Sequence, residues 1–499
     1  MKFQLPAKFV LSAILIVSAM LALIQFLYCR SLWVDEAMLA LNIIQKSAYS
    51  LLFPLDYNQV APILFLEIEK LFSWLIPNSE LGLRIFPLLS FIAAIFLFKS
   101  LVAKLFSNGL TQIFALVLFA FNPKLLYFSG EVKQYIVDVA LINLCYFLVV
   151  MPKQYSPPHY LILTLTGVFG IFLSNTAPMI LFAVICFLCI QNWQMKSRNL
   201  VVLAMVFSTW ILTFAGYYFL FLAHHPSQEV MTGYWNDLQG FIPINPFSSE
   251  FFPFYLQKVI TLKTNFGIPK LVALTIPLFL LILGIVKLVR TKKYSLLVLL
   301  LMPLFCHLGL SALKLYPFDT RLVLYLFTPG ILLMAFGFDL FQVNFLFFQK
   351  SSWILAFSIA LPLLGLSFIF LNKKQFKREE IKEALQYISA QQKQVQSIYV
   401  YYAALPAFTY YKQTHLQAME ILPSRVIEGK MHHDDHRKYG LEIGSEIKGK
   451  TWLLFTHQTP EIEQEILDQL NLSGIQIEQQ FKTVGASVYI LTHSSIQIH

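Results

Sequence analysis

Long apolar runs alternate with short polar segments over the first three quarters of the chain. A helix needs about 20 predominantly apolar residues to cross the hydrocarbon core of a bilayer. About eleven runs approach that length, and we expect each to form a membrane-spanning helix. They lie near residues 9–28, 83–105, 110–128, 135–151, 159–175, 177–193, 199–222, 269–289, 294–313, 321–343 and 352–371.

The pattern changes near residue 372, where charged residues become frequent and apolar positions take the spacing of short helices and strands. Helices are predicted at 378–392 and 460–474, strands at 397–402, 451–455 and 487–492, and a helix interrupted by Pro406 at 403–413. Strands alternating with helices indicate a small α/β layer domain. We therefore expect a polytopic α-helical membrane domain over residues 1–371 and a soluble α/β domain over residues 372–499.

Composition supports lipid as the solvent of the first part. The chain is 57% hydrophobic and 13% charged, whereas a soluble domain carries about 25% charged residues. The first run follows two lysines, as in a signal peptide, but no small-residue cleavage site follows it. We expect an uncleaved first helix.

The net charge of +10 follows a topological pattern. Lysine and arginine gather in alternate short loops, and such loops stay in the cytoplasm. This places the N-terminus in the cytoplasm and, after eleven crossings, residues 372–499 outside. Four basic residues on the outer side run against the rule: Lys373, Lys374, Lys377 and Arg378. The basic balance reflects topology and contact with anionic lipids, and it does not indicate nucleic-acid binding.

Two external loops are long in this topology, residues 29–82 and 223–268. Within the first, residues 55–77 have the apolar spacing of a helix lying in the membrane interface, with Trp74 as an anchor. Long loops without an obvious element are usually functional or disordered. The aromatic content of both loops argues against disorder.

Cysteine and histidine clusters do not indicate a metal centre. All five cysteines lie in or at the end of apolar runs, which favours core packing. Cys186 and Cys189 have the spacing of a metal pair, but no second pair accompanies them. The contiguous residues 432–436, HHDDH, cannot all converge on one ion, so a solvated loop is the better interpretation.

Charged residues near membrane depth carry the functional signal. Each costs about 2.5 to 3.5 kcal/mol at a helix centre, so such groups usually line a wet cavity and pair with one another. The predicted outer side collects nine of them: Asp35, Glu36, Arg84, Glu131, Lys133, Asp138, Lys314, Asp319 and Arg321.

Structural roles compete with functional ones at several of these positions. On a helix starting near Gly130, Glu131, Gln134 or Tyr135, and Asp138 would share one face, with Lys133 pointing elsewhere. Glu131 and Asp138 could simply pair internally, Asp35 could cap the following helix, and Arg84 could snorkel to the lipid headgroups.

Five short motifs occur in order along the membrane part. They are W-V-D-E at 33–36, Q-V-A-P at 59–62, L-R-I-F-P at 83–87, E-V-K-Q-Y-I-V-D at 131–138 and Y-P-F-D-T-R-L at 316–322. Together they resemble the bacterial membrane glycosyltransferases of the GT-C fold, in the branch related to protein O-mannosyltransferases and lipopolysaccharide-modifying transferases. The predicted C-terminal domain also fits the external domain that many such proteins carry.

The resemblance implies transfer of a hexosyl or pentosyl group from a polyprenyl-phosphate donor to a glycan, lipid or protein acceptor. The reaction would take place at the outer face of the bacterial cytoplasmic membrane, with inversion. A positioned carboxylate would take the proton of the acceptor hydroxyl, and fixed cations would stabilise the leaving phosphate.

Carried over residue by residue, the resemblance makes Asp35 the general base and Glu36 its neighbouring support or an acceptor contact. Arg84, Lys133 and Arg321 are candidates to bind the donor phosphate, since arginine in particular suits phosphate. Supporting roles in the substrate site fall to Gln59, Glu131, Tyr135, Asp138 and His225, with His224 beside the last.

Two questions stay open at this stage. The carboxylates would suit a divalent metal, but the first loop has no D-x-D motif, and we expect a reaction without a required cofactor. A transporter or flippase of lipid-linked sugars would also need buried charges, although no inverted repeat or matching pair of broken helices indicates one. An inactive scaffold that presents the C-terminal domain is a third interpretation, and the intact Asp35–Glu36 pair argues against it.

Overall fold

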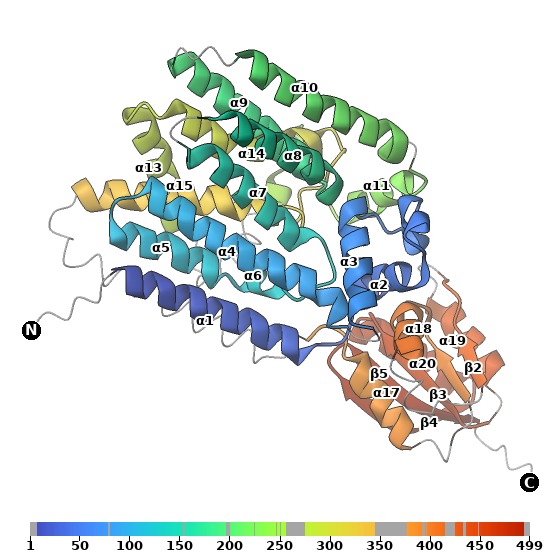
Figure 1. Cartoon of the computed structure of the whole chain (residues 1–499). Helices are drawn as coiled ribbons and strands as arrows, with labels where there is room; N and C mark the ends of the chain where they lie inside the picture. Colours follow the sequence, from blue (N-terminus) through green and yellow to red (C-terminus); the bar gives the residue numbers. More distant parts are fainter. Residues whose placement is uncertain are drawn as a thin grey trace, which may run out of the picture. The chain divides into compact units, whose positions relative to one another are not determined.

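The computed structural model of the chain (Figure 1) divides into two compact units. Unit 1 comprises Met1–Leu27, Ala48–Phe72 and Arg84–Leu371, and unit 2 comprises Tyr28–Ser47, Ser73–Leu83 and Asn372–His499. The structure describes residues 7–77, 80–152, 155–195, 200–223, 225–245, 247–249, 251–255, 275–344, 377–391, 395, 397–414, 425–432, 436–447 and 449–493.

Apolar helices dominate unit 1. They are α1 (Ala7–Tyr28), α4 (Ile85–Leu105), α5 (Gly109–Ala120), α6 (Pro123–Phe128), α7 (Tyr135–Val150), α8 (Pro157–Leu173), α9 (Ala177–Met195), α10 (Leu200–Tyr217), α13 (Thr275–Arg290), α14 (Tyr294–Ala312) and α15 (Phe327–Asn344). Of the described helices, five are long and apolar enough to cross a membrane: Lys8–Tyr28, Gly82–Leu105, Leu200–Leu222, Tyr294–Ala312 and Leu324–Gln342.

Shorter elements connect these helices. They are η1 (Tyr49–Leu52), η2 (Asp56–Asn58), α3 (Ile63–Leu75), η3 (Gly82–Arg84), a π-helical turn η4 (Tyr218–Leu222), α11 (Gln228–Asp237) and η5 (Leu324–Leu326). The expected interfacial helix is α3, and its Trp74 is exposed.

The predicted apolar runs match helices throughout the described residues, with one correction, and the run at 352–371 lies outside them. The run at 110–128 is two helices, α5 and α6. Pro123 stands at the first position of α6, and the Asn122 side chain accepts hydrogen bonds from the backbone of Lys124 and Leu125. A capped start with proline at the first position begins a new helix, so hydropathy alone missed the break.

Close backbone contact joins α13 and α15. A Cβ at Gly284 would lie 2.0 Å from the Leu333 carbonyl oxygen, and one at Gly337 would lie 1.9 Å from that of Leu280. Small residues let membrane helices approach in this way. Nearby, Lys287 of α13 forms an ion pair with Asp339 of α15, which also accepts a hydrogen bond from Thr111 of α5 at 3.0 Å.

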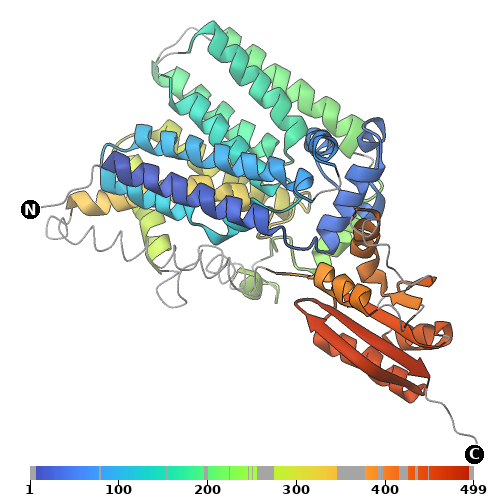
Figure 2. The ribbon, with the colours of Figure 1, turned by 60° about the horizontal axis from the view of Figure 1, so that its bottom comes forward.

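Unit 2 contains a five-stranded sheet in the order β2-β1-β3-β5-β4. Its strands are β1 (Ser397–Val400), β2 (Arg425–Glu428), β3 (Thr451–Thr456), β4 (Ile475–Thr483) and β5 (Ala486–His493). Strand β1 is parallel to β2 and β3, whereas β5 is antiparallel to β3 and β4. Figure 2 shows the long β4–β5 hairpin, coloured red, at one end of the sheet.

The helices of unit 2 are α2 (Val34–Gln45), α17 (Ile381–Ala390), η8 (Tyr402–Ala404), α18 (Leu405–Thr414), α19 (His436–Glu446) and α20 (Pro460–Leu472). Pro406 does not interrupt a helix, because it lies in the first turn of α18, where a proline costs no hydrogen bond. The sequence patterns missed β2, α19 and β4. Strands β2 and β4 have mostly exposed or half-buried side chains. Their sequences therefore show little of the hydrophobic alternation that predicts a strand.

Unit 2 also includes much of the segment 29–82, which the hydropathy pattern predicts to be a first external loop. Residues 28–47 and 73–83 cluster with residues 372–499, and helix α2 packs on α18 of the sheet domain. The segment with the W-V-D-E motif is thus built into the same compact body as the C-terminal sheet.

Candidate functional site

The W-V-D-E motif forms the start of helix α2. Trp33 occupies the N-cap position with extended backbone and no side-chain cap, and Asp35 and Glu36 lie in the first turn. The alternative that Asp35 caps this helix is therefore wrong, because the capping position belongs to Trp33. The Asp35 side chain is half-buried.

Glu36 has a different environment from its neighbour. Its carboxylate lies 3.0 Å from the Arg30 guanidinium, and the two side chains are 0% and 2% exposed. Removing one partner of a buried ion pair typically destabilises a protein by about 3 to 5 kcal/mol. Glu36 therefore holds the start of α2 in place, and Arg30, which the sequence patterns did not single out, is its partner.

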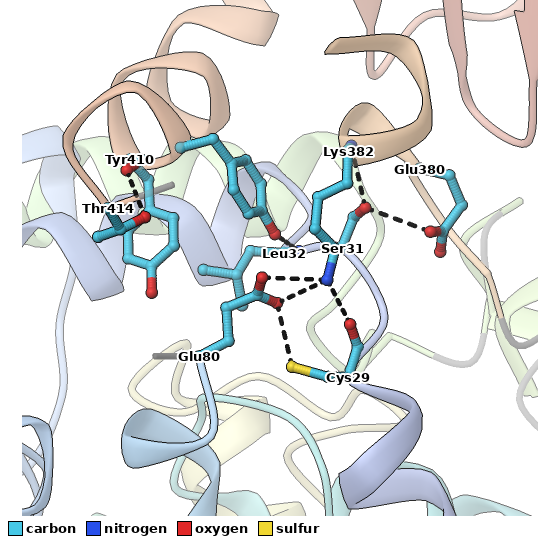
Figure 3. A network of polar contacts seen from close by, with 9 residues as sticks. Cys29, Ser31, Leu32, Glu80, Glu380, Lys382, Tyr410 and Thr414 are labelled. Atoms are coloured by element: carbon cyan, nitrogen blue, oxygen red, sulfur yellow. Dashed lines mark hydrogen bonds and ion pairs between the residues drawn. The ribbon is translucent and has the colours of Figure 1, made fainter. Parts of the chain in front are cut away.

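The segment that leads into the motif is held largely by the sheet domain of the same unit (Figure 3). Lys382 donates to the Cys29 carbonyl and forms an ion pair with Glu80 at 3.0 Å. The Ser31 hydroxyl donates to Glu380 at 3.2 Å, and the Leu32 backbone N–H donates to the Tyr411 hydroxyl at 2.8 Å. These polar contacts fix residues 29–32 immediately before the carboxylates.

Unit 1 contains the remaining candidates, and it brings Gln59 and Lys133 together. The Lys133 ammonium, 5% exposed, donates to the Gln59 side-chain oxygen at 2.8 Å. Tyr57 and Asn58 have φ values of 60° and 52°, and this left-handed turn sets the direction of the chain at Gln59. The Q-x-A-P and E-x-K-Q-Y motifs thus meet through one hydrogen bond.

The prediction that Glu131 and Asp138 share one face of a helix is wrong. Helix α7 begins at Tyr135 with Gln134 as its N-cap, so Glu131 precedes the helix and does not share its periodicity. The reason is the end of α6, where the chain turns through Ser129 to Gln134 before α7 begins. Both carboxylates are buried, at 1% and 2% exposure.

Arg321 lies against aromatic rings. Its guanidinium carbon is 5.2 Å from the ring centre of Trp235 and 5.9 Å from that of Tyr135. Trp235 belongs to α11 in the long aromatic loop, where no motif had singled it out. Cation–π contacts of this kind fix the plane of a guanidinium group.

His307, which belongs to none of the five motifs, fixes the backbone before Arg321. Its Nε2 donates to the Pro317 carbonyl at 2.9 Å, since a carbonyl can only accept, and its Nδ1 shares a hydrogen bond with the Tyr325 hydroxyl at 3.1 Å. The Phe318 N–H donates to the Gly240 carbonyl at 2.7 Å. The Y-P-F-D-T-R loop is therefore held by hydrogen bonds to His307 and to Gly240. Only the burial of a polar residue within an apolar run could have signalled His307.

Arg84 does not snorkel, because its side chain is 1% exposed within the protein. It ends the 3-10 turn η3 and occupies the N-cap position of α4. A buried guanidinium requires anionic or polar neighbours, which is compatible with phosphate recognition and with a structural role alike.

His225, expected to support the substrate site, is poorly placed to carry the positive charge that would attract a phosphate. Its Nδ1 accepts a hydrogen bond from the Ser227 backbone N–H at 3.3 Å, and burial lowers its pKa. Both features favour the neutral ring. Its neighbour His224 lies outside the described residues.

Within the described part of the chain, no group of three or more carboxylate, histidine or cysteine side chains is arranged to hold a metal ion. In the HHDDH segment, His432 pairs with Glu442 of α19, while residues 433–435 are not described.

Comparison with known proteins identifies the fold. The chain has the fold of the GT-C membrane glycosyltransferases, a helical membrane part with a small C-terminal sheet domain. ArnT from Cupriavidus metallidurans bound to undecaprenyl phosphate matches 97% of this chain and 98% of its own, with a TM-score of 0.54 and 10% identity. Apo ArnT matches 95% and 97%, with a TM-score of 0.53 and 10% identity. No protein-family profile and no curated sequence matches the chain.

Proposed function

We propose that the protein is a membrane glycosyltransferase that takes a sugar from a polyprenyl-phosphate donor at the outer face of the cytoplasmic membrane. The GT-C fold and the ArnT neighbour, whose structure holds undecaprenyl phosphate, support the lipid-linked donor. A glycan, a lipid or a protein would be the acceptor.

Asp35 acts as the general base in this proposal. As the acceptor oxygen attacks the anomeric carbon, its proton passes to the Asp35 carboxylate. The bond from the anomeric carbon to the phosphate oxygen breaks, and its electron pair stays with the lipid phosphate. Attack from the face opposite the phosphate inverts the anomeric centre.

The observation that carries the proposal is the contrast between two adjacent carboxylates. Glu36 is completely buried against Arg30, whereas Asp35 is only half-buried. A base must reach the acceptor, so only Asp35 of the pair fits that role.

Phosphate stabilisation is assigned to the cations of unit 1. Lys133 is oriented by Gln59, and Arg321 is oriented by Trp235 and Tyr135. Preorganised cations stabilise charge that develops in the transition state, because they need no reorganisation as the bond breaks. Arg84 is the third candidate.

The proposed orientation places unit 2 outside the cytoplasm. Two of the basic residues that conflict with this orientation have local partners: Lys377 pairs with Glu383, and Arg378 lies 3.6 Å from the ring centre of Trp33. These residues serve the packing of unit 2, so their charge is a poor indicator of topology.

Mass spectrometry of cell-envelope glycans with and without the protein would identify the transferred sugar, with loss of one sugar residue expected. In membranes supplied with that polyprenyl-phosphate sugar, Asp35→Asn should lower the transfer rate by about 10²- to 10⁴-fold, the usual contribution of a general base. Asp56→Asn, an exposed aspartate of the same loop, is the matched control. Normal transfer by Asp35→Asn would refute the assignment, and lost translocation of the lipid-linked sugar without any transferase activity would indicate a transporter.

A further inference from the structure

The C-terminal domain contacts nearly every residue of the segment that leads into Asp35. Lys382, Glu380 and Tyr411 bind Cys29, Ser31 and Leu32 as described above. The next two residues, Trp33 and Val34, are held by residues 378 and 379 of the same domain. All of these residues belong to unit 2.

Glu379 makes the last of these contacts, at the start of helix α2. Its Oε2 accepts a hydrogen bond from the Val34 backbone N–H at 2.9 Å. The first N–H groups of a helix have no partner within it, and Trp33 at the N-cap position provides no side-chain oxygen. Glu379 therefore does from 345 residues away what a capping serine or aspartate does locally, and its negative charge suits the positive end of the helix dipole.

The capping carboxylate is itself fixed on its other side. His457 Nδ1 lies 2.7 Å from Glu379 Oε1, and the Glu379 side chain is 4% exposed. The Trp33 ring contacts two groups of the domain, with the Arg378 guanidinium 3.6 Å from its centre and the His457 ring centre at 6.3 Å. His457 thus contacts both the capping carboxylate and the tryptophan before Asp35.

The β4–β5 turn holds the backbone that carries Glu379. The Glu380 N–H donates to the Val484 carbonyl at 2.8 Å. Gly485 has a φ of +65°, and a Cβ there would lie 1.9 Å from the Arg378 carbonyl oxygen. Only glycine fits this approach, so the sheet sets the position of residues 378–380.

We propose that Glu379 is a positioning residue for Asp35, acting as the N-terminal cap of the helix whose first turn bears that carboxylate. The inference rests on the proposed function for its catalytic consequence, but the capping itself does not. It makes the C-terminal domain a working part of the transfer site, with transfer dependent on a carboxylate or amide oxygen at position 379.

The test uses the full-length protein in nanodiscs with Glu379→Ala, Glu379→Gln and Asp35→Asn. Hydrogen exchange of the amides at 34–38 should become at least about tenfold faster in Glu379→Ala, because the first turn loses its cap. Glu379→Gln should stay near wild type, since the amide oxygen can accept from Val34 and the amide nitrogen can donate to His457.

Activity is measured as loss of sugar from a lipid extract that contains the host's polyprenyl-phosphate sugars. Glu379→Ala should lower kcat by about 10- to 100-fold, the effect of a small displacement of a catalytic group, with KM for the lipid changed less than about twofold. Glu379→Gln should restore kcat, which a loss of overall folding would not explain.

Glu463→Ala is the matched control, because Glu463 bonds to Ser487, Tyr489 and Lys482 and none of its described contacts reaches residues 28–47. It should leave both readouts unchanged. Unaltered exchange in Glu379→Ala would overturn the cap. Faster exchange with normal kcat, while Asp35→Asn is inactive, would overturn the positioning role. If Asp35→Asn is fully active, the proposed function is wrong. The exchange data alone then show whether Glu379 caps helix α2.

Discussion

Two segments that carry candidate site residues, 29–36 and 316–321, are held in place by different kinds of interaction. Residues 29–36 are held largely by charged groups: Arg30 with Glu36, Lys382 with Glu80, and Glu379 on the backbone of α2. The loop at 316–321 is held by a histidine ring, backbone carbonyls and aromatic faces. The first segment should therefore respond most to the loss of one partner of an ion pair, and the second to the loss of shape or of a neutral hydrogen bond.

The largest effect should come from Arg30→Met. It removes the Arg30 charge from the buried Glu36 carboxylate, which should lower the free energy of unfolding by about 3 to 5 kcal/mol. The double variant Arg30→Met, Glu36→Leu removes both charges and should regain much of the loss. Denaturant unfolding in detergent measures both, and a double variant as unstable as the single one would contradict this account of the pair.

An intermediate loss in the free energy of unfolding is expected for His307→Phe. The ring contacts with Tyr316, Phe318 and Tyr325 remain available to a phenyl group, but the Pro317 carbonyl and the Tyr325 hydroxyl lose a hydrogen-bond partner. An unsatisfied buried group costs about 1 to 3 kcal/mol. Tyr325→Phe should cost less in the same unfolding assay, since it leaves the Pro317 bond intact. Equal stability of His307→Phe and wild type would show that the loop is held by ring packing alone.

The smallest effect is expected at Glu383, next to the segment that holds residues 29–34. Hydrogen bonds from Lys377 and Thr483 lower its pKa from the usual value of 4.5. A lowered folded-state pKa means that the ionised carboxylate stabilises the protein above about pH 4.5 and that this contribution is lost as the pH falls through the folded-state pKa. Because Glu383 is 41% exposed, the stability difference between wild type and Glu383→Gln should be small at pH 7 and vanish at lower pH. A difference that persists in acid, followed by unfolding midpoints across pH, would point to packing instead.

The apolar helices and most of the sheet domain could be predicted from local pattern. The runs at 294–313 and 135–151 became α14 and α7 within a few residues, and 451–455 became β3. The failures have local causes as well. A capped proline start divided α5 from α6, and the turn after Ser129 delayed the start of α7, which removed Glu131 from the predicted helical face.

The candidate site was only partly accessible from the sequence. The ordered motifs named Asp35, Lys133 and Arg321, but they assigned no partner to Glu36 and no role to His307 or Glu379. The capping role of Glu379, for example, depends on a contact across 345 positions. No local pattern contains that information.

The amino-acid sequence by itself determined which segments are apolar enough to form membrane helices and where strands alternate with helices, because hydrophobicity and backbone preference act over neighbouring residues. Only the tertiary structure decided that residues 28–47 join the C-terminal sheet, that Glu36 is buried against Arg30, and that Asp35 is only half-buried. The physical reason is that burial and charge pairing depend on which distant groups the fold brings together.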